Sequence, residues 1–182
     1  MLWILDRVVI PVASGAIFVR IGNFINSEII GKASGDFSLG VQFLKDSIGE
    51  RQAVAITGIK APKKAYDAIV NDPAFSEKLA AVPFRHPAQL YESFGYIFVL
   101  LTLLYLYWKT DKSQQLGFVF GVFLVLLWTV RFFVEFVKEA QVAERGEWFL
   151  NTGQWLSIPF VLIGIYFMIQ SYKKKYSNEP LS

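Results

Sequence analysis

Long apolar stretches alternate with short polar ones along this sequence, a pattern typical of a membrane protein. A helix of about 20 residues crosses the hydrocarbon core of a bilayer. Three stretches have about that length, and a fourth, more polar stretch runs from Leu2 to about Asn26 and is expected to lie among other helices. We therefore predict an all-α polytopic membrane protein with about four transmembrane helices. The other three predicted spans are Leu90–Trp108, Leu116–Phe136 and Gly153–Tyr172.

The segment between the first two predicted spans has a different composition. Residues Gly31–Arg85 are rich in glycine, proline and charged residues and contain no apolar run of membrane length. Connections of this length usually have a function or a structure of their own. We predict a small extracytoplasmic α+β head here. Its expected helices are Lys63–Ile69 and Pro73–Ala81, and its expected strands are Leu39–Leu44 and Gln52–Ile56.

Basic residues predict the orientation of the chain. Lys173 to Lys175 follow the last span, and Lys109 and Lys112 lie in a short loop, so the positive-inside rule puts both segments in the cytoplasm. The loop Val137–Thr152 has two basic residues against three acidic ones, Glu139, Glu144 and Glu147, which fits the opposite side. The predicted boundaries are 1–30 for the first transmembrane helix, 31–89 for the head, 90–172 for three transmembrane helices and 173–182 for a basic cytoplasmic tail.

Composition narrows the chemistry. The chain is 54% hydrophobic and only 18% charged, with a mean hydropathy of +0.40, which is too apolar for an ordinary soluble domain. It has no cysteine and a single histidine, so we expect neither a thiolate nor a His-cluster metal site, and no cofactor. A net charge of +3 is too small to indicate nucleic-acid binding.

Two arginines lie in or beside the apolar stretches. Arg131 interrupts Leu116–Phe136, and Arg20 follows the apolar Val8–Val19. An arginine at membrane depth costs at least ~2.5–3.5 kcal/mol, so it normally faces the protein interior and a partner. Two of them predict a polar cavity that binds an anion. The alternative for Arg20 is a helix end whose side chain extends to the interface.

Polar residues accompany both arginines. If the first helix continues, Asn23, Asn26 and Gly31 follow Arg20 on one face, and Glu28 lies in the same motif. Glu135 is one turn after Arg131, which allows an ion pair within the helix or, alternatively, a role in orienting the anion or pairing with Arg20.

Two further motifs open the second and last predicted spans. Gln89, Tyr91 and Glu92 follow His86-Pro87 and are expected in the interface zone. His86 is either a structural hydrogen-bonding residue or a candidate base, because histidine titrates near neutral pH. The second motif, Gly153–Pro159, is interpreted as structural.

Together and in this order, these motifs resemble the prolipoprotein diacylglyceryl transferase family. The Arg-x-Gly-Asn-Phe-Ile-Asn-x-Glu-x-x-Gly pattern is matched from Arg20 to Gly31, and the His-Pro-Ser-Gln-Leu-Tyr-Glu motif has Ala88 in place of serine. Arg131 and Glu135 match the second arginine motif, and the Gly-Gln-x-Leu-Ser-x-Pro motif is complete. The resemblance covers essentially the whole chain.

The resemblance implies an enzyme of the bacterial inner membrane. Such enzymes transfer the diacylglyceryl group of phosphatidylglycerol to the lipobox cysteine of a preprolipoprotein signal peptide, forming a thioether and releasing glycerol 1-phosphate. Its partners would be phosphatidylglycerol, the signal peptide and membrane lipids. The resemblance also implies that Arg20 and Arg131 bind the phosphate, Asn23 and Asn26 orient the headgroup, and Glu28 and Glu135 hold the arginines. Gly31 would permit close approach of lipid or backbone, and the substrate-binding residues would include His86, Gln89 and Tyr91.

Three departures from the family pattern accompany this resemblance. Family members carry about three earlier spans with a His-Gly-Gly motif whose histidine is thought to act as base, and this chain begins after that point. Leu127 stands where the family usually has tyrosine, and Lys138–Gln141 replaces an Arg/Lys-x-Pro-Asp sequence. The alternatives are a non-catalytic phospholipid- or anion-binding membrane protein or an inactive truncated remnant. A transporter ranks last because no internal symmetry is evident.

Overall fold

The computed structural model describes residues 1–35, 37–139 and 150–172, most of which are helical. The chain divides into two compact units. The first contains Met1–Ile21, Leu90–Phe136 and the described residues of Ala140–Ser182. The second contains Gly22–Gln89 and Val137–Glu139. Each unit has its own hydrophobic core.

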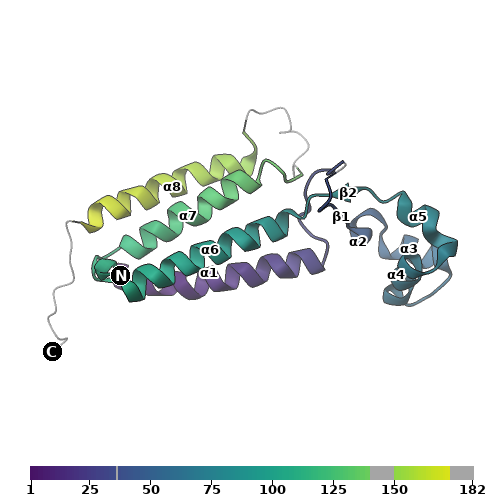
Figure 1. The fold of residues 1–182 in the computed structure, drawn as a ribbon, viewed down its shortest axis with the longest axis horizontal. Coiled ribbons are helices and arrows are strands. Elements are labelled where there is room, and N and C mark those ends of the chain that lie inside the picture. Colours follow the sequence, from purple (N-terminus) through teal and green to yellow (C-terminus); the bar gives the residue numbers. More distant parts are fainter. Residues whose placement is uncertain (36, 140–149, 173–182) are drawn as a thin grey trace. The chain divides into compact units, whose positions relative to one another are not determined.

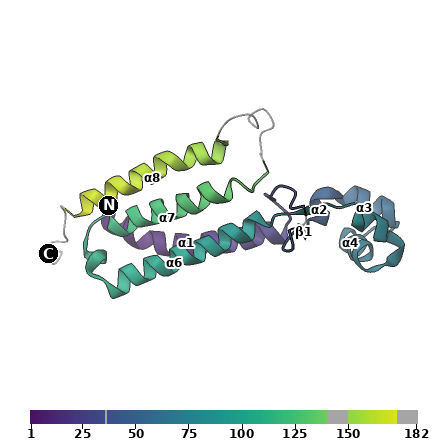
Figure 2. The ribbon, with the colours of Figure 1, turned by 45° about the horizontal axis from the view of Figure 1, so that its top comes forward.

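The first unit is built from long helices. They are α1 (Leu2–Ile25), α6 (Ala88–Lys109), α7 (Phe118–Val134) and α8 (Thr152–Ser171), and a 3-10 helix, η2 (Asp111–Gln114), precedes α7. α7 and α8 lie side by side in both views (Figures 1 and 2). α1, α6 and α7 share one apolar core, whose fully buried members are Ala13, Val99, Leu103 and Val119.

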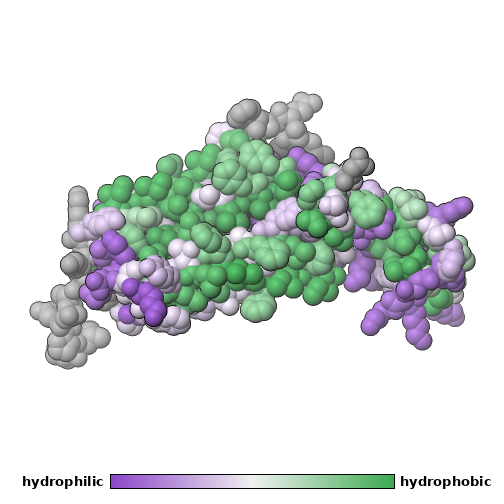
Figure 3. Space-filling model, viewed as in Figure 1, coloured by the Kyte–Doolittle hydropathy of each residue, from purple (hydrophilic) through white to green (hydrophobic). Residues whose placement is uncertain are grey.

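Three of these helices, α1, α6 and α8, are long and apolar enough to cross a membrane. α7 is apolar but has only 17 residues. Large apolar side chains such as Phe18, Phe94 and Leu162 are exposed on the unit, and apolar residues cover the face of the helices seen in Figure 3. A surface of this kind is suited to lipid rather than water. The chain is therefore a multi-pass membrane protein, and the count of four spans stays a prediction.

A buried carboxylate caps the start of α7. Asp6 is only 1% exposed, and its Oδ2 and Oδ1 accept hydrogen bonds from the backbone N–H groups of Gly117 (2.7 Å) and Phe120 (2.8 Å). The first N–H groups of a helix have no partner within it and carry a partial positive charge, so a carboxylate stabilises them. Asp6 therefore fixes α1 to the beginning of α7.

Two glycines allow α7 and α8 to approach closely. A Cβ added at Gly164 would lie 2.7 Å from the carbonyl oxygen of Gly121 and 2.9 Å from Val125 Cγ2. A Cβ at Gly121 would likewise lie 2.7 Å from the carbonyl oxygen of Gly164. Small residues at such a crossing let the two backbones pack against each other, which is a common basis of helix association in membranes.

The second unit consists of short helices and a two-stranded sheet. Its helices are α2 (Leu44–Ser47), α3 (Glu50–Thr57), α4 (Pro62–Asn71), the 3-10 helix η1 (Pro73–Phe75) and α5 (Ser76–Ala80). β1 (Val41–Gln42) and β2 (Phe84–Arg85) are antiparallel, with Val41 opposite Arg85. Ala53, Ala65 and Ile69 form the centre of the core, and the hydroxyl of Tyr66 donates to the carbonyl of Ile48 at 2.8 Å.

The two predicted helices of this segment are confirmed, by α4 and by η1 with α5. The predicted strand Gln52–Ile56 is wrong, because these residues belong to α3. The Gln52 side chain accepts a hydrogen bond from the Gly49 N–H at 3.2 Å, and Gly58 ends the helix at φ 71°. These are start and stop signals of a helix. Of the predicted strand Leu39–Leu44, only β1 is a strand.

The first helix is shorter than its motif. α1 ends at Ile25, and the backbone of Ser27 (φ 59°) and Ile29 (φ 55°) is left-handed. The expectation that Asn26 and Gly31 continue the helical face of Arg20 is therefore wrong. The basic tail 173–182 and the residues Glu144 and Glu147 lie outside the described residues.

The glycine contact between α7 and α8 gives a testable prediction. Gly164→Ala should lower the unfolding temperature of the chain in detergent micelles, because the new methyl group meets the backbone of α7. Gly15→Ala is the matched control: Gly15 lies in α1 with no atom within 4 Å of an added Cβ. Alanine there should leave stability unchanged or raise it by up to about 1 kcal/mol through helix propensity. Equal melting of the two variants would contradict the proposed packing.

Candidate anion-binding site

The Arg20 side chain forms a buried ion pair. Its Nε lies 2.6 Å from Oε2 of Glu92, and the two side chains are 12% and 0% exposed. Arg20 lies near the end of α1 and Glu92 in the second turn of α6, so the pair joins two helices that are distant in sequence. A carboxylate partner offsets much of the cost of keeping a guanidinium away from water.

Tyr96 links this ion pair to the second arginine. It lies one turn after Glu92 on α6 and is 2% exposed. The guanidinium of Arg20 donates a hydrogen bond to the Tyr96 hydroxyl. Arg131 follows Val130 on α7, and Val130 packs against Gly95, the neighbour of Tyr96 on α6. Arg20 and Arg131 therefore lie on two helices that both contact the part of α6 that carries Tyr96. We call Arg20, Glu92, Tyr96 and Arg131 the arginine cluster.

Arg131 retains hydrogen-bonding capacity. Its guanidinium carbon lies 5.5 Å from the centre of the Trp128 ring on the same helix, which is within cation–π range. Its Nε is buried and has no hydrogen-bond partner among the described residues. A buried donor without a partner is costly unless a ligand satisfies it. Arg131 is therefore suited to bind an anion.

Glu135 lies at the junction of α7 and α8. It is the residue at which α7 ends, and its carbonyl accepts a hydrogen bond from the Asn151 side chain at 3.0 Å. Its carboxylate lies against Gly153, where an added Cβ would come within 2.7 Å of Oε2. This position near the start of α8 is favourable for a negative charge. Asn151 and Gln154 cap α8 reciprocally, each at 3.0 Å, so the last motif fixes where α8 begins.

The predicted residues around Gly31 lie in the second unit. Gly31 N–H donates to the carbonyl of His86 at 3.0 Å, and an added Cβ would lie 2.9 Å from the carbonyl of Val137. Neighbouring backbone thus fills the space beside Gly31. The ring of His86 contacts Phe37, with centroids 5.1 Å apart. His86 therefore lies among backbone segments of the second unit that are joined by hydrogen bonds.

The remaining predicted residues have varied environments. The fully buried Gln89 side chain donates to the carbonyl of Glu28 at 2.5 Å, and the Glu28 N–H donates to the carbonyl of Asn23 at 2.8 Å. These bonds hold the turn that follows α1. Asn26 and Glu28 are exposed, and Asn23 and Tyr91 are half-buried. The ion-pair partner that the structure gives Arg20 is Glu92.

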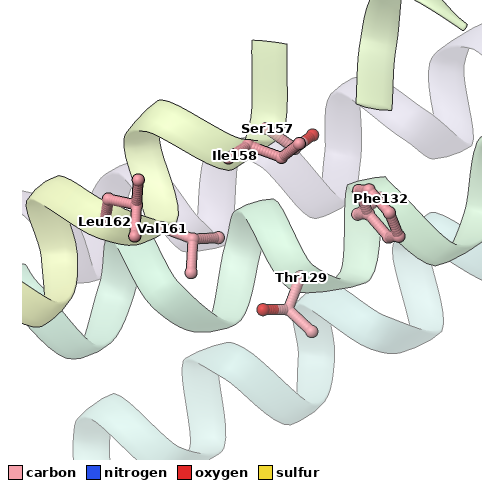
Figure 4. A pocket seen from close by; sticks show the side chains of 6 residues that line it. All are labelled: Thr129, Phe132, Ser157, Ile158, Val161 and Leu162. Atoms are coloured by element: carbon pink, nitrogen blue, oxygen red, sulfur yellow. The ribbon is translucent and has the colours of Figure 1, made fainter. Parts of the chain in front are cut away.

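A separate cavity lies between α7 and α8 (Figure 4). It has a volume of about 240 Å³ and an almost wholly apolar lining. No residue of the arginine cluster lines it. The lining residues are Thr129, Phe132, Ser157, Ile158, Val161 and Leu162. Within the described ranges, no group of three or more His, Asp or Glu side chains is placed to hold a metal ion.

Comparison with known proteins identifies the family. The family model described as prolipoprotein diacylglyceryl transferase matches residues 1–170. The chain belongs to this family. It is 40% identical over 176 residues to the phosphatidylglycerol–prolipoprotein diacylglyceryl transferase of Tolumonas auensis, covering 96% of this chain and 54% of that protein. It is 38% identical over 172 residues to the protein of the same name from Bacteroides fragilis, covering 94% and 50%. The resemblance stated from the motifs is confirmed.

The chain spans about half the length of these curated relatives. Within the matched span, both arginine motifs of this prolipoprotein diacylglyceryl transferase family member contribute to the arginine cluster. The predicted site residues did not include Glu92 and Tyr96. The sequence could have indicated Glu92, since a carboxylate in a membrane-spanning helix normally has a charged or hydrogen-bonding partner. Tyr96 could have been found only after Glu92 had been assigned to the site, because it lies one helical turn after Glu92.

The ion pair gives a second prediction. Glu92→Gln should destabilise the chain by about 3–5 kcal/mol, because it leaves the Arg20 guanidinium buried without its carboxylate. Thermal unfolding in detergent measures the loss. The double variant Arg20→Met/Glu92→Leu should regain much of it, since neither charge remains.

The matched control is the exposed ion pair of the second unit. Arg85 Nη1 lies 2.7 Å from Oε2 of Glu139, whose side chain is 54% exposed. Glu139→Gln should therefore change stability by less than about 1 kcal/mol. An equally small effect of Glu92→Gln would argue against a buried ion pair between α1 and α6.

Proposed function

We propose that this chain carries the phosphate-binding part of a phosphatidylglycerol–prolipoprotein diacylglyceryl transferase. In the proposed reaction, the thiolate of a lipobox cysteine attacks the diacylglyceryl carbon bonded to the phosphate oxygen. A thioether bond forms, the carbon–oxygen bond breaks, and glycerol 1-phosphate leaves. The thiol proton balances the new phosphate monoester. The names of the relatives support this choice of substrates.

The observation that carries the proposal is the presence of two arginines, Arg20 and Arg131, on two helices that both contact α6 near Glu92 and Tyr96. Negative charge develops on the leaving phosphate as the carbon–oxygen bond breaks. Guanidinium groups fixed in a low-dielectric site stabilise such charge strongly, because they need no reorganisation during the reaction. Arg131 has a buried donor without a partner among the described residues, and Arg20 is held by Glu92. In this proposal both arginines bind phosphate oxygens.

The other predicted residues receive supporting roles in the proposal. Asn23 and Asn26 orient the glycerol headgroup, and Gln89 and Tyr91 contribute to substrate binding. His86 stabilises the fold within the second unit rather than deprotonating the thiol, in keeping with its backbone contact to Gly31. A thiol with a pKa near ~8.5 still needs a base. We assign that base to the part of the relatives that lies outside the shared span.

The proposed location is the inner membrane of a bacterium. Long apolar helices support a multi-pass membrane protein. We propose that the second unit is the extracytoplasmic head and that the basic tail lies in the cytoplasm, in agreement with the positive-inside rule. This orientation would present the head on the side where signal peptides emerge.

We propose as a second candidate function a membrane protein that binds phospholipid without catalytic activity. The buried ion pair of Arg20 and the unpaired Nε of Arg131 among the described residues support binding of an anionic headgroup, and binding alone needs no base. Binding of phosphatidylglycerol without transfer would distinguish it from the enzyme.

The deciding experiment measures transfer of labelled diacylglyceryl from phosphatidylglycerol to a lipobox peptide. It compares the 182-residue chain with a chimera that places the N-terminal half of the Tolumonas auensis relative before it. Arg131→Ala should lower the transfer rate of the active form by about 10²–10³-fold, the usual cost of losing one fixed donor to a developing charge.

The control variant is Lys109→Ala, which removes an exposed cation at the end of α6. It should leave transfer and membrane insertion unchanged. If the chimera that carries Arg131→Ala transfers diacylglyceryl at the rate of the unaltered chimera, phosphate binding by this arginine is refuted. A chimera that binds phosphatidylglycerol but never transfers it would favour the non-catalytic alternative.

A further inference from the structure

We propose that Tyr96 is a third phosphate-contacting residue, whose hydroxyl donates its proton to an oxygen of the anion held between Arg20 and Arg131. The inference rests on the proposed function and extends it to a residue of α6 outside the sequence motifs. It assigns the phenol a direct role in recognising the headgroup.

The position of Tyr96 is fixed by the packing of α6. Along this helix Glu92, Tyr96, Val99 and Leu103 follow at helical spacing, and all four are buried on one face. Val99 and Leu103 belong to the apolar core, whereas Glu92 and Tyr96 form its polar end. The phenol is 2% exposed, so it is held inside the unit.

The contact between α6 and α7 sets the register of Tyr96 and Arg131. Gly95, the neighbour of Tyr96, packs against Val130, the neighbour of Arg131. An added Cβ at Gly95 would lie 3.0 Å from Val130 Cγ2 and 3.3 Å from Val130 Cβ. This close approach places the turn of α7 that carries Arg131 next to the turn of α6 that carries Tyr96.

The hydrogen-bond chemistry determines what the hydroxyl can do. A guanidinium has donors and no acceptor, so in its bond with Arg20 the Tyr96 oxygen must accept. The phenol therefore keeps its own proton for another acceptor. A phosphate oxygen between the two arginines is such an acceptor, and a hydrogen bond to a charged group is stronger than one between neutral groups.

A purely structural role makes a different prediction from a ligand contact. If Tyr96 only supports Arg20, removing its hydroxyl changes the stability of the chain or the orientation of the Arg20 side chain. The affinity for the anionic lipid is then not lowered specifically. Tyr96→Phe keeps the ring and removes only the oxygen. Tyr105→Phe is the matched control, because Tyr105 is an exposed tyrosine on the same helix.

The test measures binding of short-chain phosphatidylglycerol, and of short-chain phosphatidylcholine, to the full chain in detergent micelles. Tyr96→Phe should weaken phosphatidylglycerol binding about tenfold or more, the usual effect of losing a hydrogen bond to a charged group. Its unfolding temperature should remain close to that of Tyr105→Phe. Tyr105→Phe should bind phosphatidylglycerol as the unaltered chain does.

Each of the other outcomes contradicts either the proposed Tyr96 contact or the proposed function. If the unaltered chain prefers phosphatidylglycerol and Tyr96→Phe binds it equally well, the proposed contact is overturned while the proposed function stands. If Tyr96→Phe melts early and loses binding of both lipids alike, its role is structural and the contact is again overturned. If the unaltered chain shows no preference for phosphatidylglycerol, the proposed function falls and the contact falls with it.

Discussion

The burial of arginine charge is the constraint on which the rest of this structure depends. A guanidinium within an apolar helical bundle must meet a carboxylate, a hydrogen-bond acceptor or a ligand. Arg20 meets Glu92 at 2.6 Å, and Tyr96 accepts a hydrogen bond from it. The Nε of Arg131 is buried and has no hydrogen-bond partner among the described residues. This donor makes the arginine cluster suited to an anion.

The position of α7 follows from contacts at both of its ends. Asp6 caps its first turn, and Glu135 and Asn151 connect its last turn to the start of α8. Between these ends, Gly121 meets α8 and Val130 meets Gly95 of α6. A helix fixed along its length in this way holds Arg131 in a defined position relative to α6 and α8. Defined geometry is what electrostatic stabilisation of a transition state requires.

Sequence reasoning predicted the long helices well because about 20 apolar residues have few alternatives in a bilayer. It also found both arginines, since charge within such stretches is costly. It assigned Gln52–Ile56 to a strand because short apolar runs do not distinguish strand from helix, and the capping by Gly49 and Gln52 was overlooked. It also did not foresee that Glu92 is the ion-pair partner of Arg20. Pairing across distant helices leaves no periodic signal within either one.

The Asp6 cap has a consequence for the biogenesis of the protein. Its hydrogen bond to Gly117 joins residues 111 positions apart, with residues Gly22–Gln89 of the second unit between them in the sequence. During synthesis α1 therefore emerges long before the helix it caps and before the carboxylate that pairs with Arg20. Until those helices arrive, its polar side chains need water, the translocation machinery or another polypeptide. Stable packing of α1 is thus a late event, coupled to the synthesis of α6 and α7.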